Sequence, residues 1–462
     1  MSIPVVGGPH AAATRKAMLR LLPLLCLTYF MSYVDRTNIA LAKTHLQADV
    51  GISAAAFGLG AGLFFLTYAL FEVPSNLIMY RVGPRRWIAR IALSWGAVTS
   101  LMMFISDDVT FYIGRIALGA AEAGLYPAMM FMMTRWFAQK DRATAIGFIY
   151  LAPTLGLLLG GPLGGALMEL DDVAGFHGWQ WMFLVEGLIT MGIGLVVLAL
   201  LPEVPADAKW LAADEAAVLS EGAEHTARGG ESNGGTTPDG KGAHTLKGNV
   251  GQAFGRPFIL LIGVIYFLNQ LTMNGVTFNV PSIIESLDVN GSFVVGLLSG
   301  VTGIGGTIGV LVIPALYRRF PRESLTIGVL AVSPALVAAV FLAVSSPSVR
   351  IVLIGVMSML LFGTLPVFWS VAMARMTGIV AAAGLAFINT VGLTGGFVGP
   401  YLFGLAESDS GDPTSGFPII IVASLVAGGL AVALRWALRR EDRTTAGDDA
   451  PSTVERDPEV LA

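Results

Sequence analysis

Charged residues are scarce in this sequence. Aspartate, glutamate, lysine and arginine make up 13% of the 462 residues, whereas 54% are apolar and the mean hydropathy is +0.71. A soluble domain carries about 25% charged residues because its surface faces water. A chain of this length has room for about two or three soluble domains, but the shortage of charge excludes that organisation. Most of the surface must therefore face lipid.

Cysteine is nearly absent, and histidine is absent from the apolar runs. The single cysteine, Cys26, excludes an internal disulfide bond and a cysteine-based metal site. The histidines all lie outside the apolar runs, at His10, His45, His177, His225 and His244. We therefore expect no metal and no cofactor. The net charge of −4, with basic residues clustered in short loops, argues against nucleic-acid binding.

Motifs for catalysis and for ATP use are also absent. The sequence has neither the G-x-S-x-G turn of a serine hydrolase nor the H-E-x-x-H helix of a zinc protease. The segment GTTPDGKG (235–242) matches a phosphate-binding loop except at Gly242, where serine or threonine is required, and no strand precedes it. We expect neither an enzyme nor an ATP-driven pump.

Twelve apolar runs are long enough to cross a membrane, which takes about 20 mostly apolar residues. They lie near 20–41, 55–80, 87–106, 110–134, 143–168, 179–201, 257–281, 293–317, 324–344, 350–374, 380–406 and 417–438. The first run follows basic residues, as a secretory signal does. It continues to about Leu41 without a small-residue cleavage site, which indicates a permanent span. The sequence thus predicts an all-α membrane protein with twelve transmembrane helices.

A polar segment divides these spans into two sets of six. Its sequence GGESNGGTTPDGKG has the composition of a flexible linker. The expected regions are a cytoplasmic N-terminal segment 1–19, an N-terminal six-helix bundle 20–202, a cytoplasmic linker 203–256, a C-terminal six-helix bundle 257–439 and a cytoplasmic tail 440–462.

Lysine and arginine predict the orientation, because they accumulate in cytoplasmic loops. Of the 28 basic residues, 24 lie in the N-terminus, the linker, the C-terminal tail, the loops 81–90, 135–142 and 318–322, and at Arg375. Of the other four, Arg36 and Arg115 lie inside spans, so only Lys43 and Arg350 remain for the opposite side, which carries aspartates instead. Both termini are therefore expected in the cytoplasm.

Two patterns suggest duplicated halves. Spans two and eight end in NLIMYRVGPRRW (76–87) and IPALYRRFPRES (313–324), with Tyr-Arg and further arginines at the same turn. Every third span carries glycines, many at four-residue spacing, which lets backbones approach closely; they are Gly58/Gly60/Gly62, Gly156/Gly160/Gly164, Gly305/Gly309 and Gly392/Gly396/Gly399. Static packing is one interpretation, and helices that rock about a central site are the other.

Ionisable residues inside the spans are candidates for function, because a charge in hydrocarbon costs at least about 2–3 kcal/mol. At about 1.5 Å per residue, Asp35 lies roughly 22 Å along span one and Arg115 about 8 Å from the outer surface, at matching depth. We therefore expect an Asp35–Arg115 ion pair. Glu122 lies two turns deeper, where desolvation disfavours a charged carboxylate and favours proton uptake. Arg36 points about 100° away from Asp35, toward another neighbour or a bound anion.

The two acids and two bases form either a solute- and proton-handling cluster or a structural ion-pair cluster, and their depth favours the former. Glu72, near the cytoplasmic end of span two, and Glu186, at an outer helix start, are weaker candidates with simpler structural roles. Amides on spans seven and eleven join helices or line a cavity; they are Asn269, Gln270, Asn274 and Asn389.

Six segments together resemble the anion:cation symporter family of the major facilitator superfamily. They are YVDRTNIALA (33–42), YALFEVPSNL (68–77), GRIALGAAEAGLYPA (114–128), RWFAQKDRATAIG (135–147), GWQWMFLVEG (178–187) and LPEVPADAKWLAADE (201–215). That family includes bacterial carriers for tartrate, phthalate, galactonate and other sugar acids. The resemblance implies the major facilitator fold, alternating access and uptake of an organic anion with protons. It also implies a multi-pass location in the bacterial inner (plasma) membrane.

The resemblance also implies site residues. The family's proton-coupling acids match Asp35 and Glu122, and its arginine partner matches Arg115. The substrate residues of sugar-acid carriers match Tyr33, Arg36, Tyr68, Trp369 and Asn389, although depth along the span places Trp369 nearer the cytoplasmic side than the midplane.

Two departures from the family pattern stand out. Asn76 and Tyr80 replace the glycine and aspartate of the superfamily's loop motif. An apolar Ala-Pro at 152–154 replaces a glutamine of sugar-acid carriers, which suits a less hydroxylated anion.

The sequence therefore predicts a secondary active transporter that imports a small organic carboxylate by proton symport, as a monomer in a lipid bilayer. In the expected cycle, Asp35 and Glu122 take up protons from outside, the anion binds Arg36, and the bundles rock inward. The alternative within transport is an exporter or a uniporter of a small organic solute. A membrane receptor is an alternative of another class, against which the lack of a folded sensory domain argues.

Overall fold

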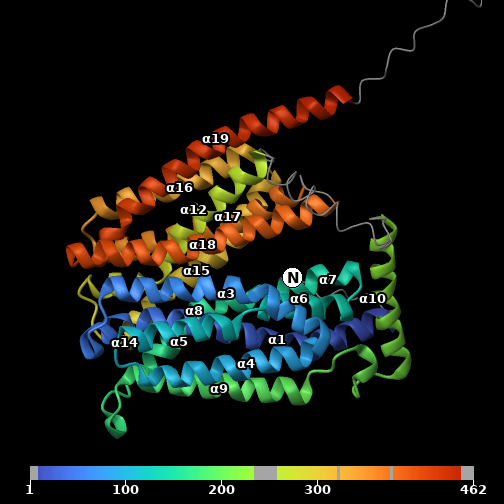
Figure 1. Cartoon of the computed structure of the whole chain (residues 1–462), viewed down its shortest axis with the longest axis horizontal. Helices are drawn as coiled ribbons and strands as arrows, with labels where there is room; N and C mark the ends of the chain where they lie inside the picture. Colours follow the sequence, from blue (N-terminus) through green and yellow to red (C-terminus); the bar gives the residue numbers. More distant parts are fainter. Residues whose placement is uncertain (1–8, 234–256, 320–322, 375–377, 449–462) are drawn as a thin grey trace, which may run out of the picture.

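The computed structural model describes residues 9–233, 257–319, 323–374 and 378–448, and Figure 1 shows that they fold into helices. The helices of the N-terminal half are α1 (Pro9–Leu41), α2 (Lys43–His45), α3 (Ala54–Val82), α4 (Pro84–Leu101), α5 (Asp108–Glu122), α6 (Leu125–Trp136), α7 (Gln139–Ile149), α8 (Leu151–Met168), α9 (Gly178–Leu200) and α10 (Ala213–Asn233). Those of the C-terminal half are α12 (Pro257–Thr277), α13 (Val280–Glu285), α14 (Ser292–Ser299), α15 (Val301–Arg319), α16 (Glu323–Ala343), α17 (Pro347–Ala374), α18 (Gly378–Ser410) and α19 (Phe417–Asp448).

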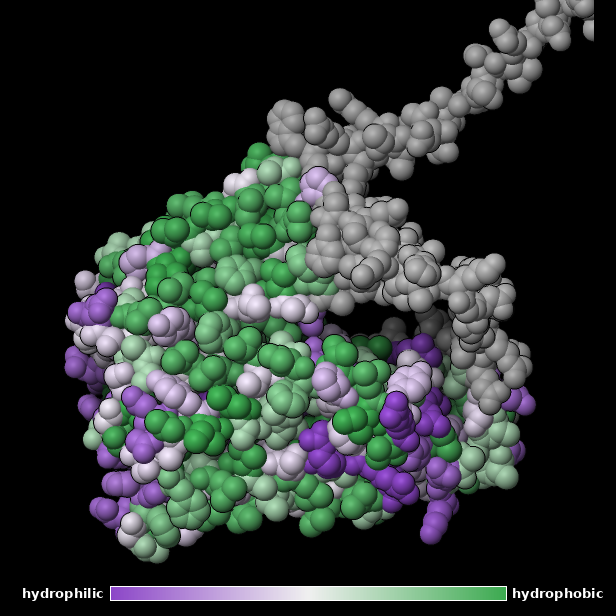
Figure 2. Space-filling model, viewed as in Figure 1, coloured by the Kyte–Doolittle hydropathy of each residue, from purple (hydrophilic) through white to green (hydrophobic). Residues whose placement is uncertain are grey.

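Long apolar helices dominate the fold. Within the described ranges, 11 helical segments are long and apolar enough to cross a membrane. The 33-residue helix α18, which packs against α12 and α3, occupies the place of the remaining predicted span. Large apolar side chains such as Leu70, Leu77 and Leu195 are exposed on the outside of the helices, and Figure 2 shows apolar residues across much of the visible surface. The predicted all-α membrane fold is confirmed.

Three of the spans are interrupted, and span four is interrupted near its middle. Span four consists of α5 and α6, separated at Ala123 and Gly124, where Gly124 has a φ of +90°. The Ser75 hydroxyl donates a 2.7 Å hydrogen bond to the freed carbonyl of Ala123. The other breaks lie between α7 and α8 and between α14 and α15. Irregular backbone at membrane depth occurs where it is buried in protein or lines a cavity, so the break directly after Glu122 marks a functional region.

The helices form two layers in Figure 1, with α1 and α3–α9 in one and α12 and α15–α19 in the other. The layers meet along two helix pairs, α3 with α18 and α8 with α14. A Cβ atom built on Gly58 would lie 2.3 Å from the Pro400 carbonyl oxygen, and one on Gly161 would lie 2.2 Å from that of Gly296. These glycines therefore permit backbone-to-backbone contact between the halves.

Both helix pairs make their close contacts at the end of the molecule where α1 ends and α3 begins, which we term the sealed end. Figure 2 shows an opening at the opposite, right-hand end of the molecule. We term this the open end. The two halves are thus closed together at one end and separated at the other.

Part of the segment expected as a flexible linker is helical. Residues 213–233 form α10, which packs against α1 and α6. The Lys16 ammonium lies 2.5 Å from the Glu215 carboxylate, and the Trp210 ring stacks on Trp136 at 5.8 Å. Polar composition alone did not reveal these contacts. Residues 234–256 of the predicted linker, 1–8 of the N-terminal segment and 449–462 of the tail lie outside the described residues.

Candidate functional site

Arg36 and Glu122 form an ion pair between α1 and α5. Arg36 Nη2 donates to Glu122 Oε1 over 2.9 Å, and the guanidinium carbon lies 4.7 Å from the Tyr33 ring centroid and 5.4 Å from that of Phe64. The Glu122 side chain is 2% exposed, whereas the Arg36 side chain is 22% exposed. Arg36 Nε has no partner among the described residues. Arg36 therefore reaches solvent-accessible space while holding unused hydrogen-bonding capacity.

Asp35 faces a different helix. The Trp95 indole N–H of α4 donates to Asp35 Oδ2, and the Thr99 hydroxyl donates to the same oxygen over 3.1 Å. Asp35 Oδ1 is buried and has no partner among the described residues. Our expectation of an Asp35–Arg115 ion pair is wrong, because the described residues show no such salt bridge. Equal depth does not fix direction around the helix, and Asp35 points toward α4 rather than α5.

Arg115 is deeply buried on α5, with 1% of its surface exposed. Its Nε donates to the Gly60 carbonyl over 3.3 Å, and its guanidinium carbon lies 4.8 Å from the Phe64 ring centroid. Phe64 thus lies against both Arg115 and Arg36. The two cations and the two acids are gathered at the contact of α1, α3, α4 and α5.

The predicted substrate residues come from both halves. Tyr33 lies under Arg36, and the Tyr68 ring lies 6.0 Å from that of Phe64. In the C-terminal half, the partly buried Trp369 of α17 meets the Tyr266 ring edge-on at 5.3 Å, and Asn389 is half-buried on α18. Tyr33, Arg36 and Tyr68 therefore form one group with the acids, while Trp369 belongs to an aromatic group of the other half.

Tyrosines that the sequence interpretation missed connect these groups. The Tyr29 ring lies 5.5 Å from Tyr33, and the Tyr126 hydroxyl lies 2.7 Å from that of Tyr150 at the break between α7 and α8. Tyr266 of α12 is close enough to Tyr33 to interact electrostatically. The spacing of Tyr29 and Tyr33, one helical turn apart on the face of Arg36, was an available signal. The result is an aromatic, hydroxyl-bearing surface around one exposed guanidinium.

A second charged cluster lies at the sealed end. Lys43 donates to Glu407 of α18 and, over 2.5 Å, to the Asn279 side-chain oxygen. Thr44 donates to Glu285 over 3.3 Å. Burial lowers the pKa of the Lys43 ammonium, and the two carboxylates oppose that shift. Burial also raises the pKa of Glu285. This cluster joins the halves through polar side chains rather than backbone.

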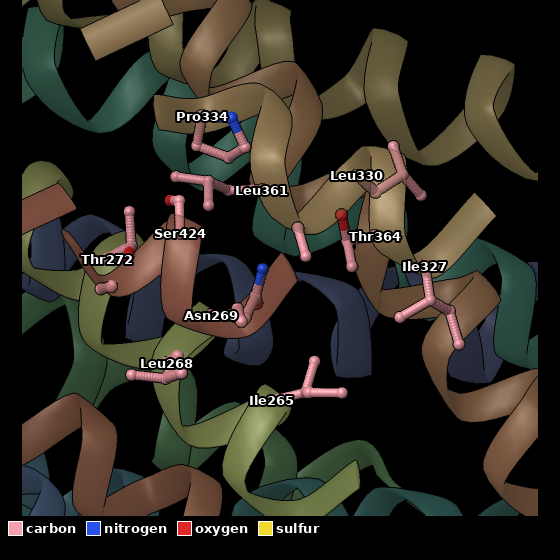
Figure 3. Close-up of a pocket in the computed structure, with 13 residues that line it drawn as sticks. Ile265, Leu268, Asn269, Thr272, Ile327, Leu330, Pro334, Leu361, Thr364 and Ser424 are labelled. Atoms are coloured by element: carbon pink, nitrogen blue, oxygen red, sulfur yellow. The ribbon is translucent and has the colours of Figure 1, made fainter. Parts of the chain in front are cut away.

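The cavity in Figure 3 lies within the C-terminal half, between α12, α16, α17 and α19. Its volume is about 20 Å³, which is enough for one water molecule and far below the roughly 300 Å³ of a small-molecule site. Its polar lining includes Asn269, Thr272, Thr364 and Ser424. Asn269, expected to join helices or line a cavity, thus lines a small internal space away from Arg36.

The chain belongs to the Major Facilitator Superfamily, whose model matches residues 25–400. The family resemblance is confirmed by curated relatives. A quinolone resistance transporter of Acinetobacter baumannii is 34% identical over 445 residues, covering 95% of this chain and 98% of the relative. A putative tartrate transporter of Agrobacterium vitis is 35% identical over 444 residues, covering 95% and 97%.

A solved structure shows the same fold. A bacterial homologue of the human lysosomal transporter Spinster, in an inward-facing and unoccupied conformation, aligns with a TM-score of 0.69 at 18% identity, covering 95% of this chain and 99% of that one. The protein is accordingly a multi-pass membrane transporter, and the expectation that it is not an enzyme is confirmed.

Proposed function

We propose that this transporter imports a small organic carboxylate together with protons by alternating access. The observation that carries the proposal is the Arg36–Glu122 ion pair, with Glu122 buried and Arg36 partly exposed. A carboxylate substrate and the Glu122 carboxylate compete for the same guanidinium. Protonation of Glu122 weakens its hold on Arg36 and leaves the cation for the substrate, so proton binding favours anion binding.

The residues around the ion pair provide separate groups for substrate binding and for proton binding. Arg36 presents a planar fork suited to a carboxylate, and Tyr33, Tyr68, Trp369 and Asn389 add hydroxyl, ring and amide groups for the rest of the substrate. Asp35, held by Trp95 and Thr99 without a cation, serves as the second proton site. Arg115 keeps positive charge near both acids. Relatives named as putative tartrate transporters agree with a carboxylate substrate.

The conformation has a simple interpretation in this scheme. The excess of basic residues in the termini and in alternate loops supports cytoplasmic termini in a bacterial cell. With that orientation, the open end is cytoplasmic and the transporter faces inward. The bundles 20–202 and 257–439 then rock about Arg36, and a single chain contains the complete path. Import ends when the anion leaves through the open end and Glu122 pairs with Arg36 again.

Export is the second candidate, favoured by the relative named as a quinolone resistance transporter. In an exporter, protonation of the same acids from outside would instead release the solute outward, so that protons enter as the solute leaves. The direction of the driving gradient separates the two functions, since an exporter accumulates solute on the acidic side of the membrane.

Reconstituted full-length protein tests the proposal. Proteoliposomes with an acidic exterior should accumulate radiolabelled tartrate or another carboxylate from a panel, and substrate addition should acidify the lumen, as read by an enclosed pH dye. Glu122→Gln and Asp35→Asn should abolish gradient-driven accumulation. Glu122→Gln should retain substrate exchange between equal pools, because exchange needs no net proton movement.

Proton symport would be overturned if uptake did not change with the pH gradient or with substitutions at Asp35, Arg36 and Glu122. Accumulation of a quinolone on the acidic side would replace it with export. An exposed carboxylate, Asp108 at the start of α5, provides a control, because Asp108→Asn changes charge without touching the site.

A further inference from the structure

A third acid, Glu186 of α9, is buried in the N-terminal half and has no role in the cycle above. Only 3% of its surface is exposed. Asn38 of α1 donates its amide N–H to Glu186 Oε2, and Glu186 Oε1 has no partner among the described residues. No lysine or arginine of the described residues forms a salt bridge with it. A carboxyl group in these surroundings must be protonated, and therefore neutral, during part of the transport cycle, because burying an unpaired charge is costly.

Several other polar atoms around Glu186 are buried without partners. They are Asp35 Oδ1, Asn38 Oδ1 and Thr190 Oγ1. Asn38 lies one turn from Asp35 on α1, and Thr190 lies one turn from Glu186 on α9, so the four side chains share the contact of these two helices. Buried polar groups that lack partners require explanation. A site that gains and loses a proton accounts for them, because a protonated carboxyl group donates an O–H to a neighbouring oxygen and a carboxylate does not.

Position along the membrane gives the arrangement a direction. Glu186 lies about 12 Å from the start of α9 at Gly178, and Asn38 lies about 4.5 Å beyond Asp35 toward the sealed end. Glu186 therefore sits between the sealed end and Asp35. The elements packed against α9 are α1, α4, α8 and the short helix Met102–Phe104. Among their described residues, Asp35 of α1 is an acid one turn from Asn38, the residue that donates to Glu186.

We propose that Glu186 carries protons between the outer side and Asp35, as an additional proton site of the transporter. In the transfer, the O–H bond of protonated Glu186 breaks and an O–H bond forms on the Asp35 carboxylate through one water molecule that accepts one proton and releases another, because the two carboxyl groups make no hydrogen bond to each other. Asn38 keeps Glu186 oriented toward α1. This inference rests on the proposed proton symport, and it adds the route by which Asp35 is loaded while the sealed end opens.

The decisive variant is Glu186→Gln, because glutamine preserves the acceptor oxygen for Asn38 but cannot carry a proton. We expect at least a tenfold loss of proton-driven uptake in proteoliposomes, with substrate exchange within twofold of the parent protein. Glu186→Asp should recover part of the uptake. Asp108→Asn, at an exposed position, is the matched control for a lost carboxylate and should leave both measurements unchanged.

An independent measurement separates this idea from the proposed function. Infrared difference spectra of the detergent-solubilised protein across a pH jump should contain a protonated-carboxyl band that disappears in Glu186→Gln and remains in Asp108→Asn. A proton-coupled parent protein with an unaffected Glu186→Gln variant overturns the role of Glu186 alone. Equal loss of uptake, exchange and thermal stability in Glu186→Gln also overturns it, because that pattern marks a structural residue. A parent protein without proton coupling overturns the symport proposal itself.

Discussion

Lys43 of the N-terminal half and Glu407 of the C-terminal half form a buried ion pair at the sealed end. Their positions are 364 residues apart in the chain. A transporter that alternates between openings must separate these two residues whenever the sealed end opens. The pair therefore contributes directly to the balance between the conformations, and its strength is open to measurement.

Removing one partner should shift the protein toward opening at the sealed end. In Glu407→Gln, buried Lys43 loses the carboxylate that it contacts and keeps only Glu285 nearby while the halves are closed. We expect a cost of about 3 kcal/mol, which corresponds to roughly a hundredfold change in population. Labelling of a cysteine placed at buried Ser299, in a Cys26→Ser background, should rise accordingly with a membrane-impermeant thiol reagent.

The double variant Lys43→Glu with Glu407→Lys exchanges the two charges. It tests whether the ion pair keeps the sealed end closed. Restored protection of the Ser299→Cys thiol is expected, because the attraction between the halves returns. Protection that stays unchanged in Glu407→Gln would show that the backbone contacts alone close this end.

Gly161→Ala should disturb transport because a Cβ atom there would lie 2.2 Å from the Gly296 carbonyl oxygen. The methyl group pushes α8 away from α14 at a cost of about 1–3 kcal/mol in the closed sealed end. Uptake should fall severalfold while the amount of folded protein in the membrane, measured by fluorescence-detected size exclusion, stays near normal. Gly192→Ala is the matched control, since nothing lies within 4 Å of a Cβ at that position; equal effects of the two variants would contradict this prediction.

Substitution by lysine should have different effects at partly exposed Arg36 and at buried Arg115. Arg36→Lys keeps a positive charge but loses the planar fork, so the substrate KM should rise about tenfold or more while thermal stability changes little. In Arg115→Lys the hydrogen bond to the Gly60 carbonyl is lost at a site with 1% exposure, and the melting temperature should fall. Uptake kinetics and thermal unfolding of the same preparations check both results, and a reversed pattern would exchange the roles of the two arginines.

Trp369→Ala tests the contribution of the C-terminal half to substrate binding. Loss of its edge-on contact with Tyr266 and of its exposed face should weaken binding by about 0.5–1.5 kcal/mol, roughly a two- to tenfold rise in KM. Proton movement per substrate should stay the same, because the acids lie in the other half. A changed proton-to-substrate ratio in Trp369→Ala would contradict this separation of roles.

The spans and the candidate charges could be predicted from the sequence because both depend on local composition. Apolar runs of about 20 residues identify membrane helices. A charged residue inside such a run is a candidate functional residue, because placing it in hydrocarbon costs free energy. Arg36, Glu122 and Arg115 were found this way, and the structure gathers them around Phe64. Depth along a helix follows directly from residue number.

Partners across helices could not be predicted, because they depend on how each helix is rotated. Asp35 and Arg36 are adjacent in the chain but point about 100° apart, so one meets Trp95 and the other meets Glu122. The Lys43–Glu407 and Asn38–Glu186 contacts join distant segments that carry no local signal. Helix α10 escaped prediction because its composition is polar, and it is held in place by tertiary contacts such as that of Lys16 with Glu215.

The glycine contacts between α3 and α18 and between α8 and α14 have a consequence for how such proteins diverge. Main-chain surfaces meet there, at Gly58 with Pro400 and at Gly161 with Gly296, while the groups proposed to bind the substrate, such as Tyr33 and Trp369, lie at other positions. Mutation can therefore alter which molecule is recognised without altering how the two halves come together. A transporter can therefore evolve a new substrate while keeping the inherited contacts between its halves. Relatives about one-third identical, whose names refer to quinolone resistance and to tartrate transport, are consistent with this.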